Sequence, residues 1–124
     1  MELVRLVESA PPSEALIRVY SSYCVLNSRA AKLMGLSPEG GVMVFYDKEQ
    51  KEAGRMRLYI GRKDTDAFPV IRRGRSYLIN SRHLARKLAD NMEGRGSYRI
   101  CPEDSVEKCG TTYYNIFFRK YGNR

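Results

Sequence analysis

Short runs of aromatic and β-branched residues, separated by clusters of Gly, Pro, Ser and Asn, fill most of this 124-residue chain. Such runs are typical of β-strands, and the clusters between them are typical of turns. The clearest run is RMRLYIGR at 55–62, where Met56, Leu58 and Ile60 alternate with polar or aromatic residues. The pattern predicts a mainly β chain with strands at 15–20, 23–26, 42–48, 55–62, 68–73, 76–80, 97–101 and 111–118.

Two short helices are expected between these strands. NSRAAKLMGL at 27–36 has a capping Asn or Ser at its start and Gly35 at its end. NSRHLARKLADNM at 80–92 places Leu84 and Leu88 four residues apart, on one face of a helix. Together with the strands, these helices predict an α+β fold, in which curved antiparallel sheets carry two short helices.

The tripeptide Asn-Ser-Arg occurs twice, at 27–29 and 80–82, each time after a Tyr-containing strand and before a helix. This repeat predicts two similar ββα-type units, at about 15–62 and 68–121, within a single domain spanning 15–124. Residues 1–14 precede that domain, and the sequence does not determine whether they are ordered.

Positive charge is concentrated in the middle of the chain. The protein has 22 Lys and Arg against 14 Asp and Glu, which gives a formal charge of +8. Ten of the basic residues but only two acidic ones lie between residues 55 and 87. The whole excess therefore comes from about a quarter of the chain, as expected for a surface that binds a polyanion; a solvated charged face is the alternative.

A nucleic acid is the polyanion that this composition favours. Arginine pairs bidentately with phosphate, and tyrosine rings provide surfaces on which bases of a single strand stack. Tyr59 alternates with Arg55 and Arg57 on one expected strand face, and Tyr77 lies close to Arg75. The candidate nucleic-acid-binding residues are Arg55, Arg57, Tyr59, Arg62, Lys63, Arg72, Arg73, Arg75, Tyr77, Arg82, Arg86 and Lys87.

Two family resemblances bear on the form of the nucleic acid. From residue 42 to 92, four expected strands are followed by a helix, an order that resembles the Whirly and transcription-cofactor type of single-stranded-DNA-binding domain. Residues 26–61, which contain the stretch LNSRAAKLMGLSPEGGVMVFYDKE and all but the last residue of the later RLYIGR, resemble the half-repeat of the AbrB/SpoVT swapped-hairpin family. The first resemblance implies binding to single-stranded DNA in transcription regulation or DNA maintenance. The second implies a dimeric regulator that binds duplex DNA.

Single-stranded DNA is the favoured partner, with duplex DNA or RNA as alternatives. A protein-interaction module whose basic stripe binds an acidic partner is a third hypothesis. A homodimer or higher oligomer is compatible with a small β-rich domain.

Catalytic, metal and cofactor functions are not expected. The chain has three Cys and one His, His83, which is a poor set for a zinc site, and it has no Gly-rich phosphate loop. We therefore expect a protein that is not an enzyme. An odd number of cysteines and the lack of a long apolar run favour a cytoplasmic protein without a membrane span.

Overall fold

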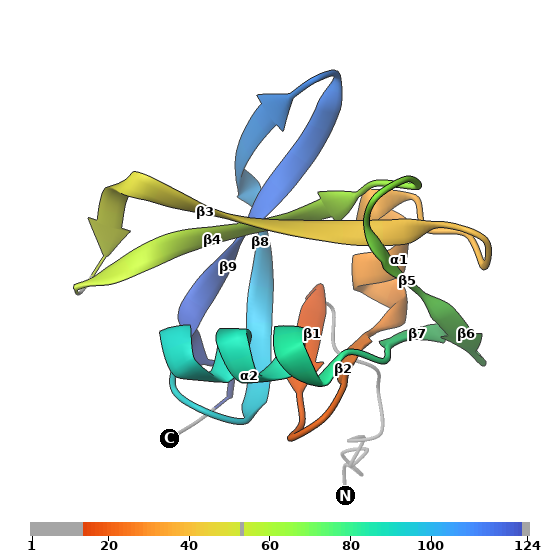
Figure 1. Cartoon of the computed structure of the whole chain (residues 1–124), viewed down its shortest axis with the longest axis horizontal. Coiled ribbons are helices and arrows are strands. Elements are labelled where there is room, and N and C mark those ends of the chain that lie inside the picture. Colours follow the sequence, from red (N-terminus) through yellow and green to blue (C-terminus); the bar gives the residue numbers. More distant parts are fainter. Residues whose placement is uncertain (1–13, 53, 123–124) are drawn as a thin grey trace, which may run out of the picture.

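The computed structural model describes residues 14–52 and 54–122 (Figure 1). Most of the N-terminal segment set apart in the sequence therefore lies outside the described residues. The described chain forms nine strands and two helices, in the order β1 (Leu16–Val19), β2 (Cys24–Leu26), α1 (Ser28–Met34), β3 (Gly41–Glu52), β4 (Arg55–Arg62), β5 (Phe68–Pro69), β6 (Ile71–Arg73), β7 (Ser76–Ile79), α2 (Arg82–Asn91), β8 (Gly96–Lys108) and β9 (Thr111–Lys120).

All nine strands belong to one antiparallel sheet that curls into a nearly closed barrel. Its strand order is β5-β3-β4-β9-β8-β1-β2-β7-β6. The two ends of this order, β5 and β6, are separated in the chain only by Val70. The segment 68–73 thus pairs with β3 through Phe68 and Pro69 and with β7 through the residues of β6. This shared segment brings the two ends of the sheet together.

The expected α+β class is wrong, because the described residues form mainly antiparallel sheet with only two short helices, of 7 and 10 residues. The difference comes from the charged segments KEQKEAG and PEDSVEKCG, which, apart from Lys48, lie outside the strands expected at 42–48 and 97–101. In the structure β3 continues to Glu52 and β8 to Lys108, where most side chains are exposed. Backbone pairing with β4 and β9 holds these extensions in strand conformation without an apolar face.

The strand register carries the same 53-residue offset as the Asn-Ser-Arg tripeptides. Arg18 pairs with Val25 in the first hairpin, and the residues 53 positions later, Ile71 and Leu78, pair in the second. The first hairpin, β1–β2, lies between β8 and β7, which belong to the second half of the chain. Within the single sheet, the first hairpin of each half, β1–β2 or β6–β7, therefore pairs with strands of the other half.

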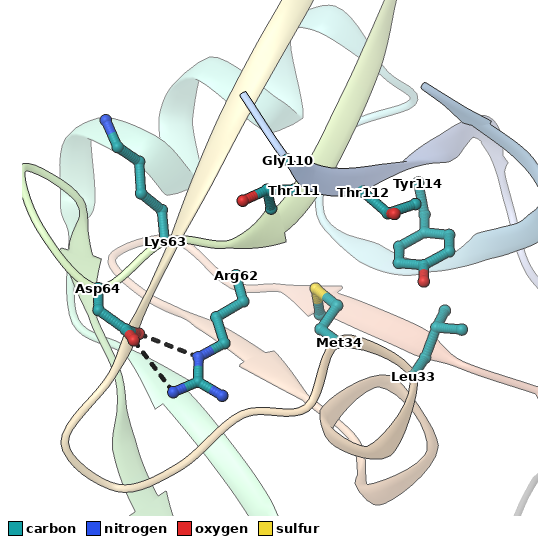
Figure 2. Close-up of a pocket in the computed structure, with 9 residues that line it drawn as sticks. All are labelled: Leu33, Met34, Arg62, Lys63, Asp64, Gly110, Thr111, Thr112 and Tyr114. Atoms are coloured by element: carbon teal, nitrogen blue, oxygen red, sulfur yellow. Dashed lines mark hydrogen bonds and ion pairs between the residues drawn. The ribbon is translucent and has the colours of Figure 1, made fainter. Parts of the chain in front are cut away.

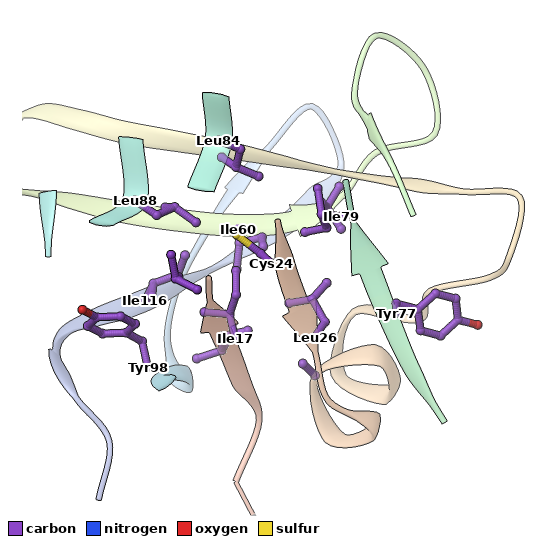
Figure 3. Packing of buried hydrophobic residues seen from close by; sticks show 14 of the residues in the cluster. Ile17, Cys24, Leu26, Ile60, Tyr77, Ile79, Leu84, Leu88, Tyr98 and Ile116 are labelled. Carbon is purple, nitrogen blue, oxygen red and sulfur yellow. The ribbon is translucent and has the colours of Figure 1, made fainter. Parts of the chain in front are cut away.

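The core lies inside the curled sheet. Ile17, Leu26, Ile60 and Ile79 are fully buried there, and Leu84 and Leu88 of α2 pack onto the same cluster (Figure 3). α1 packs against β1, β2 and β7, whereas α2 lies on the other side of the molecule in Figure 1. Burial of these aliphatic side chains is the main source of stability for a fold of this size.

Candidate nucleic-acid interface

A basic groove lies between α1 and the β6–β7 hairpin. We call it the α1–hairpin groove; its volume is about 840 Å³. Four of its lining residues are the cations Arg29, Lys32, Arg72 and Arg75, and no carboxylate among the described residues lines it. Two elements far apart in sequence thus present converging positive charge, an arrangement suited to a phosphate backbone.

The capping of α1 orients the helix side of this groove. Asn27 caps the helix: its side-chain oxygen accepts hydrogen bonds from the backbone N–H of Ala30 at 2.9 Å and of Leu16 at 3.0 Å. Gly35 ends the helix in the left-handed conformation, with φ of 66°. Because Arg29 and Lys32 are three residues apart, both exposed side chains lie on one face of the helix.

A tight turn orients the hairpin side. Gly74 has φ of 60°, a left-handed conformation that glycine adopts readily. The Arg72 Nε donates a hydrogen bond to the carbonyl oxygen of Gly74 at 3.1 Å, which holds this guanidinium beside the turn. Arg72 and Arg75 are exposed, so both remain accessible to a ligand.

Tyr77 lines the groove but offers little aromatic surface. Its side chain is only 8% exposed. Its hydroxyl donates to the carbonyl oxygen of Leu36 at 3.5 Å, a long contact that directs the ring toward the segment after α1. Figure 3 shows the ring directed away from the other labelled core residues. The geometry makes Tyr77 a packing residue beneath the cations, with no open face for a base.

Tyr59 is also buried, with 4% of its surface exposed. It does share a strand face with Arg55 and Arg57, as the alternation indicates, and the Arg57 guanidinium carbon lies 5.8 Å from its ring centroid. The outer part of the β8–β9 hairpin lies near this face: Tyr113 packs edge-on against Phe45, next to Tyr59, at a centroid distance of 4.8 Å. The stacking surface expected at 55–62 is therefore occupied by the protein itself.

The β4 arginines have partners within the protein. Arg57 forms an ion pair with Asp104, and the Arg55 guanidinium carbon lies 5.2 Å from the ring centroid of Phe118. Within the described part of the chain, the Nη1 of Arg55 and the Nε of Arg57 are buried without a hydrogen-bond partner. Both side chains contribute mainly to sheet packing.

Arg62 is held at the other end of β4. Its Nε and Nη2 donate to the two carboxylate oxygens of Asp64 at 3.1 and 3.0 Å (Figure 2). Its Nη1 donates to the carbonyl oxygen of Gly35 at 2.6 Å. The hydrogen bond from Arg62 lowers the pKa of the Asp64 carboxyl below its usual value. Lys63, next in sequence, lines a hollow together with Arg62 and Asp64 (Figure 2).

The remaining candidates are divided between two elements. Arg73 is exposed at the end of β6, beside the groove but outside its lining. Arg82, Arg86 and Lys87 are exposed on α2, on the other side of the molecule from α1 in Figure 1. The structure thus brings Arg72, Arg75 and Tyr77 together and places the β4 and α2 residues elsewhere.

Arg29 and Lys32 were not among the expected binding residues, because the excess of positive charge along the sequence lies at 55–87. A signal was available, since Arg29 closes the first Asn-Ser-Arg tripeptide and Lys32 follows three residues later on the same expected helix. Tyr20 and Tyr23 at the β1–β2 turn were also not among the expected residues. Their rings stack at a centroid distance of 4.6 Å. The Arg18 guanidinium carbon lies 5.3 Å from the Tyr20 ring centroid.

Other kinds of site find no support among the described residues. No group of three or more His, Cys, Asp and Glu side chains in residues 14–52 and 54–122 is arranged to hold a metal ion. Neither helix in that part of the chain is long and apolar enough to cross a bilayer.

Comparison of the chain with protein-family models, curated proteins and solved structures finds no match.

Proposed function

We propose that this protein is a non-enzymatic DNA-binding protein that holds the phosphate backbone of a duplex in the α1–hairpin groove. The observation that carries the proposal is the convergence of Arg29, Lys32, Arg72 and Arg75 in a lining whose described residues include no carboxylate. Phosphate contacts of this kind supply most of the affinity of DNA-binding proteins and position them on the duplex.

Duplex DNA fits this groove better than a single strand does. Single-strand binding combines a basic groove with exposed aromatic faces. The rings of Tyr59 and Tyr77 are buried, so the groove offers charge without a stacking platform. The proposal therefore favours the duplex over the single strand that the sequence favoured.

The exchanged hairpins also support a duplex. In the swapped-hairpin family that residues 26–61 resemble, two half-repeats act as a dimer on duplex DNA. Here β1–β2 lies between β8 and β7, so one chain supplies both halves. This arrangement reduces the need for a second subunit. A DNA-binding role also fits the cytoplasmic location expected from the sequence.

Single-stranded DNA remains the second candidate because of the β1–β2 turn. Tyr20 and Tyr23 are partly exposed and stack with an interplanar angle of 19°, next to Arg18. A base can extend such a stack. Tyr23→Ala should then weaken single-strand binding and leave duplex binding unchanged.

Fluorescence anisotropy with a labelled duplex, each of its strands and the matching RNA, across a salt series, tests the proposal. We expect the duplex to bind tightest. Arg72→Ala/Arg75→Ala should weaken duplex binding about tenfold or more and reduce the salt slope by about 2, since each phosphate contact on a duplex contributes roughly 0.9.

The matched control is Arg95→Ala/Arg119→Ala, which removes the same charge from exposed positions outside the groove lining. Equal losses in both double variants would show that total charge, and not the groove, holds DNA. Tighter binding of the single strand would favour the second candidate. Background binding to every oligonucleotide would leave the protein-interaction hypothesis.

A further inference from the structure

A second hollow, different in chemistry from the α1–hairpin groove, lies between α2 and the β3–β4 hairpin. Its volume is about 310 Å³. Leu58, Leu84 and Leu88 are buried in its lining, and Val44 and Met56 are half-buried beside them. A concave, mainly apolar hollow of this size with a few polar groups in its lining is the usual form of a small-molecule site.

The register of β3 and β4 explains why the hollow exists. Tyr46 of β3 pairs with Leu58 of β4, and Val44 pairs with Ile60, so their apolar side chains share the face that turns toward α2. Both strands continue past α2 in Figure 1, so the helix covers only part of that face. Tyr46 is 53% exposed, a large value for an aromatic residue at the rim of an apolar hollow.

A hollow beside α1 has a different lining from the hollow beside α2. Phe68 lines the α2-side hollow, whereas the residue 53 positions earlier, Ala15, lines a separate hollow of about 300 Å³ beside α1. That hollow has the charged residues Glu14, Arg29 and Lys32 in its lining. Of these two hollows, the one beside α2 is the more apolar, and none of its described lining residues is a carboxylate.

The polar groups of the α2 hollow define the charge of its occupant. Lys87 supplies a cation, and the imidazole of His83 lies one helical turn before it on the same helix. Asn91 also lines the hollow, with its Nδ2 donating to the carbonyl oxygen of Lys87 at 2.9 Å. Lys87 makes no ion pair with any described residue, so its ammonium is available to an anion.

We propose that the α2 hollow binds a small monocarboxylate with an apolar body. The aromatic or aliphatic part would replace water against Leu58, Leu84 and Met56, and the carboxylate would accept a hydrogen bond from the Lys87 ammonium at the rim. A charge-assisted hydrogen bond combined with apolar burial selects such a ligand over a neutral one of the same shape. This site goes beyond DNA binding and does not depend on it.

Isothermal titration calorimetry and ¹H–¹⁵N NMR with 3-phenylpropionate as the probe test the proposal. We expect saturable binding with a Kd below about 1 mM. Shifted amide signals should cluster on α2, β3 and β4. The uncharged 3-phenylpropan-1-ol should bind at least about tenfold more weakly, because it lacks the carboxylate.

Two variants address the two parts of the site. Lys87→Gln should weaken phenylpropionate binding about tenfold, whereas Arg86→Gln, the neighbouring exposed cation outside the lining, should leave it unchanged. Met56→Trp should fill the hollow and abolish binding, with a thermal melt to verify folding. If Met56→Trp does not fold, Lys87→Gln and the alcohol still decide the question.

Absence of saturable binding, or equal binding of the acid and the alcohol, would overturn the proposal. So would shifts that map to the α1–hairpin groove, since these would report a phosphate-type site. Concentration-dependent dimerisation that Met56→Trp abolishes would show that a second copy of the chain fills the hollow, and would overturn the proposal as well.

Discussion

The Nη1 of Arg62 donates a hydrogen bond of 2.6 Å to the carbonyl oxygen of Gly35, across 27 positions of the sequence. This contact joins the end of β4 to the C-terminus of α1, where helix carbonyl groups lack partners within the helix. The same guanidinium holds the Asp64 carboxylate. Arg62 therefore connects α1, which carries half of the α1–hairpin groove, to the sheet.

Replacement of Arg62 should affect stability more than DNA binding. We expect Arg62→Ala to lower the Tm and to leave the salt slope of duplex binding unchanged, because its donors already have protein partners. Thermal melts and anisotropy titrations measure the two effects. A reduced salt slope at unchanged Tm would instead make Arg62 a phosphate contact.

The Arg62–Asp64 pair should also give a defined pH dependence. The pKa of the Asp64 carboxyl is lowered in the folded protein. The stabilisation from its ion pair with Arg62 is therefore fully present above the pKa of Asp in the unfolded chain, about 3.9, and is lost as the pH falls through the folded pKa. The difference in Tm between the wild type and Arg62→Ala should therefore shrink below about pH 4. A difference that stays constant down to pH 2 would argue against this linkage.

Gly61 should not tolerate a side chain. A Cβ at this position would lie 2.6 Å from the carbonyl oxygen of Thr112 and 2.6 Å from the Cδ1 of Tyr113. Because backbone would have to move, Gly61→Ala should cost about 2 kcal/mol or more in the free energy of unfolding. Urea denaturation measures this cost.

Gly110→Ala is the matched comparison, since no atom lies within 4 Å of its added Cβ. Its φ of 79° still carries a backbone cost of about 1 kcal/mol. A loss at Gly61 no larger than that at Gly110 would show that β9 does not approach β4 as closely as the structure indicates.

The three cysteines should differ in reactivity. Cys24 is fully buried, and desolvation raises the pKa of its thiol to about 12, while Cys101 is buried and Cys109 is exposed. Native protein treated with iodoacetamide at pH 8 should gain one modification, at Cys109, since the thiolate is the reactive form. Mass spectrometry of native and urea-unfolded samples checks this, and rapid native labelling of Cys24 would contradict its burial.

Asn27 should be more sensitive to truncation than the cap of the second helix. Its Oδ1 accepts from both Ala30 and Leu16, and its Nδ2 donates to the carbonyl oxygen of Glu14 at 3.0 Å. Asn27→Ala should cost about 2 kcal/mol in the free energy of unfolding. Ser81→Ala, which removes the one cap bond to Leu84, should cost about 1 kcal/mol. Equal losses of unfolding free energy for the two variants in denaturant melts would mean that the hydrogen bond from Leu16 of β1 to Asn27 does not contribute to stability.

Local features of the sequence identify the elements but not their lengths. The expected helices at 27–36 and 80–92 contain α1 and α2, because capping residues and apolar spacing act within a few residues. The strand extensions of β3 and β8 depend on pairing across a hairpin, and their exposed charged residues give no apolar signal. Because that signal is missing, the sequence predicts strands that end at 48 and 101.

The candidate site shows the same division between local and distant information. Alternation correctly places Arg57 and Tyr59 on one face of β4. Tyr113 and Phe45 pack beside that face, and this contact is not visible in the local sequence, because Tyr113 belongs to β9, about 50 residues further along the chain. Convergence of Arg29 with Arg75 likewise depends on how α1 meets the β6–β7 hairpin. A charge count along the chain locates basic segments, but their meeting in space is a tertiary property.

The shared segment 68–73 has a consequence for how the protein avoids self-association. Unpaired strand edges act as templates for other chains, and a sheet whose two ends meet has few of them. Here that protection depends on a stretch of six residues centred near Val70, which is 4% exposed. A fluctuation that released this stretch would uncover the backbone of β3 and of β7 at the same time. Amyloid-like or swapped assembly of this protein should therefore start there, and a substitution that loosens Val70 should be the most aggregation-prone change in the barrel.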